Sequence, residues 1–227
     1  MTNILLWILL LIINFGLILI AYRLFGKAGL YSWMAIAAIL ANIQVLKTVE
    51  LFGMVATLGN IIYGTSFLCT DILTENHSKK EAKKGVWIGF FSLISTVIIM
   101  TICLWFVPHE SDFAQGSLET IFSVMPRIAL ASLVAYLISN FHDIWAYNFW
   151  RKKFSGYKNI WIRNNLSTMT SQLIDSIIFS TITFLGVFEN DVFWQIFIST
   201  FIIKMIVAIC DTPFLYIATR WKEKTND

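Results

Sequence analysis

Charged residues are scarce in this sequence. Only 14% of its 227 residues are Asp, Glu, Lys or Arg, whereas 57% are hydrophobic. A water-soluble domain carries about 25% charged residues, so this chain has too few charges to cover a surface in water and too many apolar residues for one core. A lipid bilayer removes the difficulty, because the outer surface can then be apolar. The composition therefore predicts an integral membrane protein.

Cysteine is rare as well, and the common enzyme motifs are missing. The three cysteines, an odd number, lie in apolar runs without metal-ligand spacing, which argues against both a disulfide framework and a metal site. The sequence has no Gly-x-Ser-x-Gly turn, no His-Glu-x-x-His helix and no P-loop. We therefore expect no enzyme, no cofactor and no metal. The net charge of +3 does not indicate nucleic acid binding.

Long apolar stretches are abundant. A helix needs about 20 mostly apolar residues to cross the hydrocarbon core of a bilayer, and the first stretch lacks the basic start and the cleavage site of a signal peptide, so we expect it to be retained. We predict an all-α fold, a polytopic integral membrane helical bundle with about seven transmembrane helices in a single domain over residues 1–227. The expected spans are Ile4–Tyr22, Gly29–Leu46, Met54–Leu73, Val86–Val107, Ile121–Phe141, Leu166–Phe188 and Phe193–Thr219.

Lysine and arginine gather on one side of this topology. The segments that follow the first, third, fifth and seventh expected spans hold 14 of the 17 basic residues. Because basic loops stay preferentially in the cytoplasm, we expect the N-terminus outside, the C-terminus in the cytoplasm, and the chain in the plasma (cell inner) membrane. Anionic lipid headgroups are sufficient partners for these loops.

Polar residues inside the expected spans recur every three or four positions, which places them on one face of each helix. An ionisable group within a span costs a few kcal/mol and usually faces the interior of the bundle. The set indicates a path for a small polar molecule, although buried charges that only hold helices together are the alternative. The stripes are Gln44 with Lys47, Asp71 with Glu75, Ser132–Tyr136–Asn140–Asp143, Asn165–Thr168–Gln172–Asp175, and Thr200–Lys204–Asp211.

Four sequence blocks resemble one known family. The first runs from Asn42 to Glu75 and includes Phe67–Leu68–Cys69–Thr70–Asp71, and the second runs from Pro126–Arg127 to Asp143. The third is Arg163–Ser176, and the fourth combines Lys204 with Asp211–Thr212–Pro213. In these blocks the chain resembles the queuosine precursor transporters, also called the vitamin uptake transporter family.

The resemblance implies import of a 7-deazaguanine precursor of the tRNA nucleoside queuosine, 7-cyano-7-deazaguanine or 7-aminomethyl-7-deazaguanine, for tRNA modification. It also implies a fold similar to the membrane-embedded substrate-binding subunits of energy-coupling-factor vitamin importers. Together, the stripes and the family blocks give the expected substrate-binding residues: Asn42, Gln44, Lys47, Tyr63, Asp71, Glu75, Arg127, Ser132, Tyr136, Asn140, Asp143, Asn165, Gln172, Asp175, Lys204 and Asp211.

Two other functions stay open at this point, a substrate-capture subunit of an ATP-driven vitamin or purine importer and a non-transporting membrane scaffold. The expected partners are a purine-like small molecule and lipid, while a homodimer and an ATPase partner are left undecided. Asp175 and Lys204 should both lie near mid-depth in consecutive spans joined by a short loop, which favours antiparallel neighbours. We expect them to form an ion pair, because pairing offsets the cost of removing both charges from water.

The one-sided lysines and arginines lead to the first prediction. A reporter enzyme fused after Asp227 should be active only if it is of the kind that works in the cytoplasm. Parallel fusions of a reporter that works only outside the cell provide the measurement. Activity of that outside reporter at the C-terminus would contradict the orientation.

Overall fold

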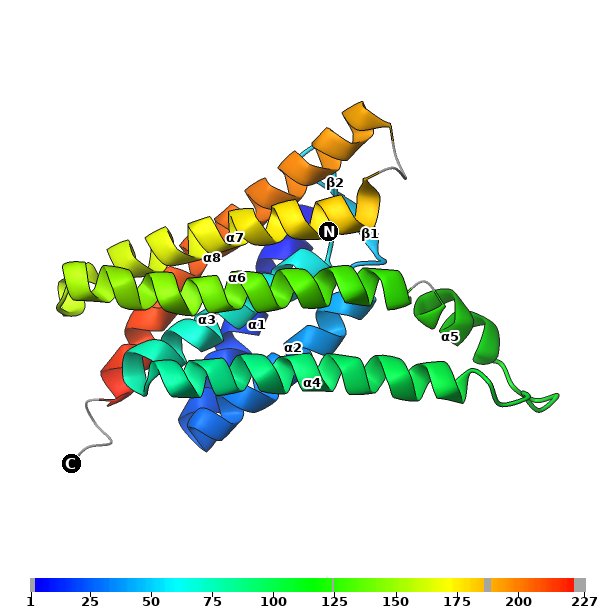
Figure 1. Ribbon diagram of the computed structural model, residues 1–227, viewed down its shortest axis with the longest axis horizontal. Coiled ribbons are helices and arrows are strands. Elements are labelled where there is room, and N and C mark those ends of the chain that lie inside the picture. The colour runs from blue at the N-terminus through cyan, green and yellow to red at the C-terminus, as the bar shows by residue number, and fades with distance from the viewer. Residues whose placement is uncertain (1–2, 124, 186–188, 223–227) are drawn as a thin grey trace.

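The computed structural model describes residues 3–123, 125–185 and 189–222, and these fold into a bundle of long helices with one small hairpin (Figure 1). Their elements are α1 (Asn3–Phe25), α2 (Lys27–Gln44), β1 (Thr48–Leu51), β2 (Met54–Thr57), α3 (Gly59–Asn76), α4 (Lys79–Cys103), α5 (Gln115–Phe122), α6 (Met125–Lys153), the 3-10 turn η1 (Tyr157–Asn159), α7 (Ile160–Phe184) and α8 (Asn190–Lys222).

The all-α membrane bundle expected from composition is confirmed. Long helices occupy the seven expected positions, and four of the described helices, α1, α4, α6 and α8, are long and apolar enough to cross a membrane by length and composition. The other three long helices, α2, α3 and α7, do not meet that measure. In α3 and α7 many of the buried side chains are polar. The number of seven crossings therefore stays a prediction.

The boundary between the second and third expected spans is wrong. We expected helix up to Leu46 and again from Met54, but α2 ends at Gln44 and residues 48–57 form an antiparallel hairpin in which Leu51 pairs with Met54. The two turn residues between them, Phe52 and Gly53, have positive φ angles of 53° and 75°. Two successive positive φ angles fit the right-handed twist of a two-residue hairpin, and this turn shortens the helix that follows.

Local capping signals move other helix boundaries. The fourth expected span began at Val86, but α4 begins at Lys79, where the Ser78 hydroxyl accepts a hydrogen bond from the Glu81 backbone N–H at 3.3 Å. This Ser-x-x-Glu pattern is a helix-start signature. The fifth expected span began at Ile121, but the short α5 ends at Phe122 and α6 continues twelve residues beyond Phe141 to Lys153.

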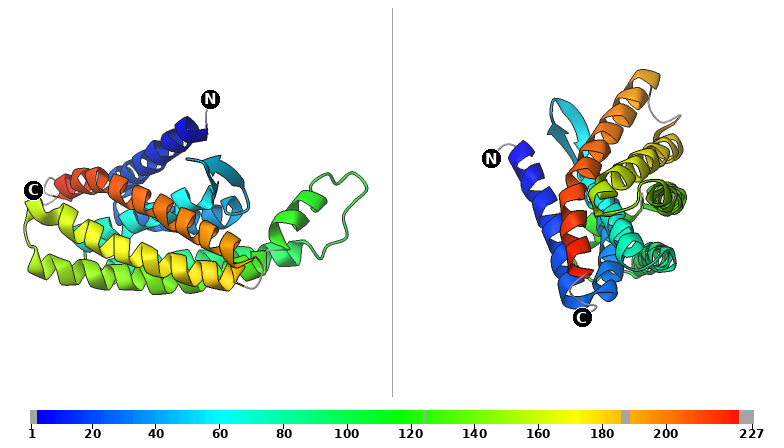
Figure 2. Two further views of the ribbon diagram at one scale, coloured as in Figure 1. Left: turned by 90° about the horizontal axis from the view of Figure 1, so that it is seen from above. Right: turned by 90° about the vertical axis from the view of Figure 1, so that its left-hand side faces the viewer.

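Helix α3 lies at the centre of the bundle, and its side chains are almost all buried although many are polar. The outer surface is the reverse, with large exposed apolar side chains such as Leu5 and Ile12 on α1 and Phe91 and Ile99 on α4. Seen from above, α1 and the hairpin lie on one side of the bundle and α6 and α7 on the other (Figure 2). An apolar exterior around a polar interior is the arrangement that a bilayer requires.

The two ends of the bundle differ in charge. The turns after α1, α3 and α6 and the C-terminal end of α8 lie toward the left and lower left of Figure 1, and they carry most of the lysines and arginines. The hairpin, the loop after α4 and the C-terminal end of α7 lie toward the other end. We call the end with most of the lysines and arginines the basic end, and the opposite end the acidic end. By the positive-inside rule the basic end is expected in the cytoplasm.

Gly29 generates a prediction about packing between α1 and α2. A Cβ atom at Gly29 would lie 2.1 Å from the backbone carbonyl oxygen of Ala21, whereas one at Gly16 would meet nothing within 4 Å. The Gly29→Ala substitution should therefore force the helices apart and lower the free energy of unfolding by about 1–3 kcal/mol. Thermal unfolding in detergent measures this, with Gly16→Ala as the matched control. Equal melting temperatures for the two variants would contradict the close approach.

Candidate functional site

A buried ion pair between α7 and α8 is the core of the candidate site. Lys204 Nζ donates to Asp175 Oδ2, and both side chains are almost fully buried. The pairing that the sequence predicted is thereby confirmed. The Tyr63 hydroxyl of α3 donates to Asp175 Oδ1 at 2.5 Å, and the Ser139 hydroxyl of α6 donates to the same oxygen at 3.2 Å. One carboxylate thus receives hydrogen bonds from three neighbouring helices.

The ammonium group of Lys204 is also surrounded by aromatic rings. Its Nζ atom lies 5.0 Å from the ring centroid of Tyr63 and 5.8 Å from that of Phe179. Aromatic faces attract a cation, and more so where water is excluded. The rings therefore hold the ammonium beside the Asp175 carboxylate and give the site a flat aromatic wall.

A cavity lies next to the ion pair and is lined by residues of α2, α3, α6, α7 and α8. The empty space measures about 330 Å³, part of it open to the surroundings. Two buried polar atoms on its wall, Asn42 Oδ1 and Asn60 Nδ2, have no hydrogen-bond partner in the described structure, so they offer an unused acceptor and an unused donor. The lining residues are Ala41, Asn42, Val45, Gly59, Asn60, Tyr63, Ser132, Ala135, Asp175, Phe179 and Lys204.

Some of the expected substrate-binding residues meet at this cavity. Those that line it are Asn42, Tyr63, Ser132, Asp175 and Lys204. Tyr136 lies directly behind, with its ring centroid 5.9 Å from that of Tyr63. Asn60 was not among the expected residues, although its spacing of three from Tyr63 places both on one face of α3 and could have indicated it.

Three expected acids form a separate buried cluster closer to the basic end. Asp71, Asp143 and Asp211 are each 0% exposed and do not line the cavity. The Thr168 hydroxyl donates to Asp71 Oδ2 at 3.2 Å, and Asn164 Nδ2 donates to Asp211 Oδ1 at 2.6 Å. The polar stripes are therefore divided by depth into two groups, which helical spacing alone does not reveal.

Two expected amides are buried in the same interior. Asn140 Nδ2 donates to the Tyr136 carbonyl of its own helix at 3.0 Å, and Asn140 Oδ1 has no partner in the described part of the chain. Gln172 is 0% exposed, and both polar atoms of its amide have no hydrogen-bond partner among the described residues. Gln172 lies between Thr168 and Asp175 on one face of α7, so it connects the two groups along that helix.

Four expected residues lie away from the cavity. Gln44 is at the end of α2 and Lys47 is exposed at the start of the hairpin, and neither lines the cavity beside Asp175. Arg127 is exposed, and its Nη2 donates to the Ile182 carbonyl at 3.4 Å. Asn165 Nδ2 donates to the Thr212 hydroxyl of α8 at 2.9 Å. A role of these four residues in substrate binding stays a prediction.

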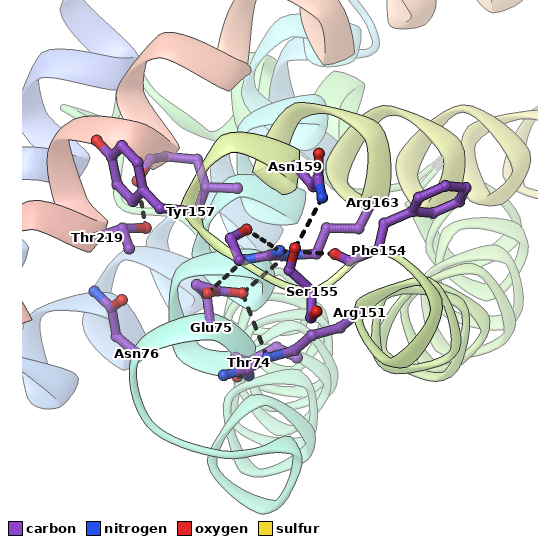
Figure 3. A network of polar contacts seen from close by, with 12 residues as sticks. Thr74, Glu75, Asn76, Arg151, Phe154, Ser155, Tyr157, Asn159, Arg163 and Thr219 are labelled. Carbon is purple, nitrogen blue, oxygen red and sulfur yellow. Dashed lines mark hydrogen bonds and ion pairs between the residues drawn. The ribbon is translucent and has the colours of Figure 1, made fainter.

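Glu75, expected among the binding residues, is engaged in a polar network at the basic end (Figure 3). Arg163 Nη2 donates to Glu75 Oε1 at 2.6 Å and Arg163 Nε donates to Oε2 at 3.1 Å, while the Tyr147 hydroxyl also donates to Oε2 at 3.0 Å. We expected Arg163 in a basic loop, but α7 begins at Ile160 and buries it to 2% exposure. A carboxylate with this many protein donors has little capacity left for a ligand.

No group of three or more His, Cys, Asp or Glu side chains within residues 3–123, 125–185 and 189–222 is arranged to hold a metal ion. The chemistry that the site offers is hydrogen bonding, charge and stacking.

Comparisons with known proteins agree on one family. A family model described as "Putative vitamin uptake transporter" matches residues 57–218. A curated protein of Bacillus subtilis (strain 168), "Probable queuosine precursor transporter", is 45% identical over 214 residues, which are 94% of this chain and 93% of that protein. No solved structure matches.

The Asp175–Lys204 pair yields a stability prediction. Lys204→Met alone leaves a buried carboxylate without its countercharge and should cost about 3–5 kcal/mol. Adding Asp175→Asn should recover part of that loss, because no uncompensated charge is left. Unfolding of the four proteins in detergent gives the coupling free energy.

The partly exposed pair between Lys27 and Glu81, with an N–O distance of 3.6 Å, is the matched control. A cycle with Lys27→Met and Glu81→Gln should give a much smaller coupling, because solvent screens an exposed ion pair. Additive effects at Asp175 and Lys204 would contradict a buried ion pair.

Proposed function

Because this chain belongs to the vitamin uptake transporter family, we propose that it imports a queuosine precursor of the 7-deazaguanine type, which binds at Asp175. The chain is a multi-pass membrane protein and a transporter of a queuosine precursor. The observation that carries the proposed site is a single buried carboxylate, paired with a lysine, on the wall of a cavity in the bundle interior.

The lining groups complement a deazaguanine ring. The ring N–H and the exocyclic amine form a donor edge, which one carboxylate can accept with two parallel hydrogen bonds. The ring carbonyl is an acceptor that suits the unused Asn60 Nδ2, and the exocyclic amine has a second proton that suits the unused Asn42 Oδ1. The flat face of the ring can stack on Tyr63. Each unpartnered atom of the cavity wall thus has a counterpart on the ligand.

Lys204 gives this site a way to bind and release. In this structure its ammonium group neutralises Asp175. The precursor enters by displacing Lys204, so that its donor edge takes over the carboxylate and the ammonium turns toward the ring carbonyl or the Phe179 ring. The carboxylate exchanges one hydrogen-bond donor for another and the displaced ammonium gains a neutral acceptor or an aromatic face, so neither charged group is left without a polar partner, which would be costly.

The charges of the lining favour the neutral precursor. Among the described lining residues the only acid is Asp175 and the only cation is Lys204. An aminomethyl group carries a positive charge that would face Lys204 without a second carboxylate of its own. We therefore propose that the site binds 7-cyano-7-deazaguanine in preference to 7-aminomethyl-7-deazaguanine.

The cellular setting follows from the same function. We place the chain in the plasma membrane with the basic end in the cytoplasm, so the cavity beside Asp175 faces the outside. Uptake by proteoliposomes that contain only this protein would separate an independent transporter from a capture subunit that requires an ATPase partner.

The binding site is tested with the Asp175→Asn/Lys204→Met double variant, which keeps the interior free of unpaired charge. We expect 7-cyano-7-deazaguanine to raise the melting temperature of the unmodified protein, because a ligand of the folded state stabilises it. The double variant should stay folded and show no such shift. Asp112→Asn, in the exposed loop before α5, is the matched acid-to-amide control and should respond like the unmodified protein. A normal shift in the double variant would remove Asp175 from the site.

A further inference from the structure

Helices α3 and α7 are joined by polar contacts whose order shows that the two helices run antiparallel. Tyr63 of α3 contacts Asp175, Asp71 contacts Thr168, and Glu75 contacts Arg163. The first and last of these contacts are twelve residues apart on both helices, which corresponds to about 18 Å. The same pair of helices is therefore bridged once beside the cavity and once at the basic end.

The bridge at the basic end is centred on Arg163. Besides holding both oxygens of Glu75, its Nη1 donates to the Phe154 carbonyl at 3.2 Å and to the Gly156 carbonyl at 2.9 Å (Figure 3). Arg151 of α6 adds a hydrogen bond to the Thr74 carbonyl at 2.9 Å. The end of α3, the end of α6, the α6–α7 loop and the first turn of α7 are thus tied together by side chains.

Side chains rather than close backbone packing hold α3 to α7. The close backbone neighbours of α7 are mainly α6 and α8, and those of α3 are mainly α2 and α8. Helix α8 packs against both α3 and α7, so the basic ends of α3 and α7 can move apart about this shared neighbour when the Glu75–Arg163 bridge breaks. Small movements of packed elements about a few residues are a usual form of domain opening.

The position of this bridge suits a barrier. Along α3 the cavity residue Tyr63 comes first, then Asp71 of the buried cluster and last Glu75, so this cluster lies between the cavity and the bridge. A molecule that leaves the cavity toward the basic end would pass the polar interior and then meet the Arg163 network. Apolar side chains of similar volume could hold the helices together with no loss of stability. Charged side chains differ in that they can exchange their protein partners for water when the helices separate.

We propose that the Glu75–Arg163 ion pair is the gate on the cytoplasmic side of this transporter. It is closed in this structure, in which Arg163 holds both carboxylate oxygens of Glu75, and it opens to release the precursor. The inference rests on the proposed function, and it assigns Glu75 to gating rather than to precursor binding.

Labelling of a single cysteine tests the gate without any precursor. In a background with Cys69, Cys103 and Cys210 replaced by alanine, Thr168→Cys places one thiol between the gate and the cavity. A charged, membrane-impermeant thiol reagent is applied to inside-out vesicles. Glu75→Gln should raise the labelling rate about tenfold or more, because a hydrogen-bonded charge pair that keeps the gate closed is lost. Glu81→Gln, an acid at the same end outside this network, is the control and should leave the rate unchanged.

Cross-linking separates a gate from a permanent brace. The Glu75→Cys/Arg163→Cys variant in the same background, but without the Thr168 thiol, is joined with a short bifunctional thiol reagent that can be cleaved by reduction. We expect the cross-linked protein to bind 7-cyano-7-deazaguanine but to lose uptake in proteoliposomes, and reduction to restore uptake. Uptake that continues in the cross-linked state would overturn the gate, as would unchanged labelling of Glu75→Gln. If the cysteine-free protein takes up no precursor at all, the proposed function fails, while the labelling comparison still decides the gate.

Discussion

The constraint on which this structure depends is that carboxylates buried in the bundle must find their partners inside it. Asp175 meets Lys204, Tyr63 and Ser139, and Glu75 meets Arg163 and Tyr147. An uncompensated charge in this interior would cost several kcal/mol, so each acid determines which helices stand next to it. Helix α3 supplies Tyr63 to Asp175 at one end of the interior and Glu75 to Arg163 at the other. These partners explain why such a polar helix can be buried so deeply.

This polar interior also explains the uneven apolarity of the helices. Helices α1 and α4 present large apolar side chains to the outside and contribute few polar groups inside. Helices α3 and α7 carry the hydrogen-bonding side chains; α3 is shielded by its neighbours, whereas α7 turns its polar face inward and keeps apolar side chains such as Leu173 and Ile177 outside. A helix that does not face lipid has no need for a continuous apolar surface, and the polar groups it can then carry are those that a small polar ligand requires.

The two bridges between α3 and α7 give the proposed transport cycle a simple physical form. At one bridge, Asp175 can exchange Lys204 for the donor edge of a purine-like ring. At the other, Glu75 and Arg163 close the way toward the basic end. Both steps replace one partner of a buried charge with another, so neither requires a bare charge in a medium of low dielectric constant. Binding and release can then alternate between the two ends of one helix pair.

The sequence alone was sufficient to predict the membrane bundle, the long helices and the pairing of Asp175 with Lys204. These features depend on apolar length and helical spacing, which are local properties of the chain. The hairpin at Phe52–Gly53 was missed, since an apolar run does not distinguish the end of a helix from a strand. Only the tertiary structure separated the acids near Asp71 from the cavity, brought Asn60 to its wall and joined Glu75 to Arg163. Spacing assigns a side chain to a face of its own helix, but the depth and rotation of neighbouring helices decide which faces meet.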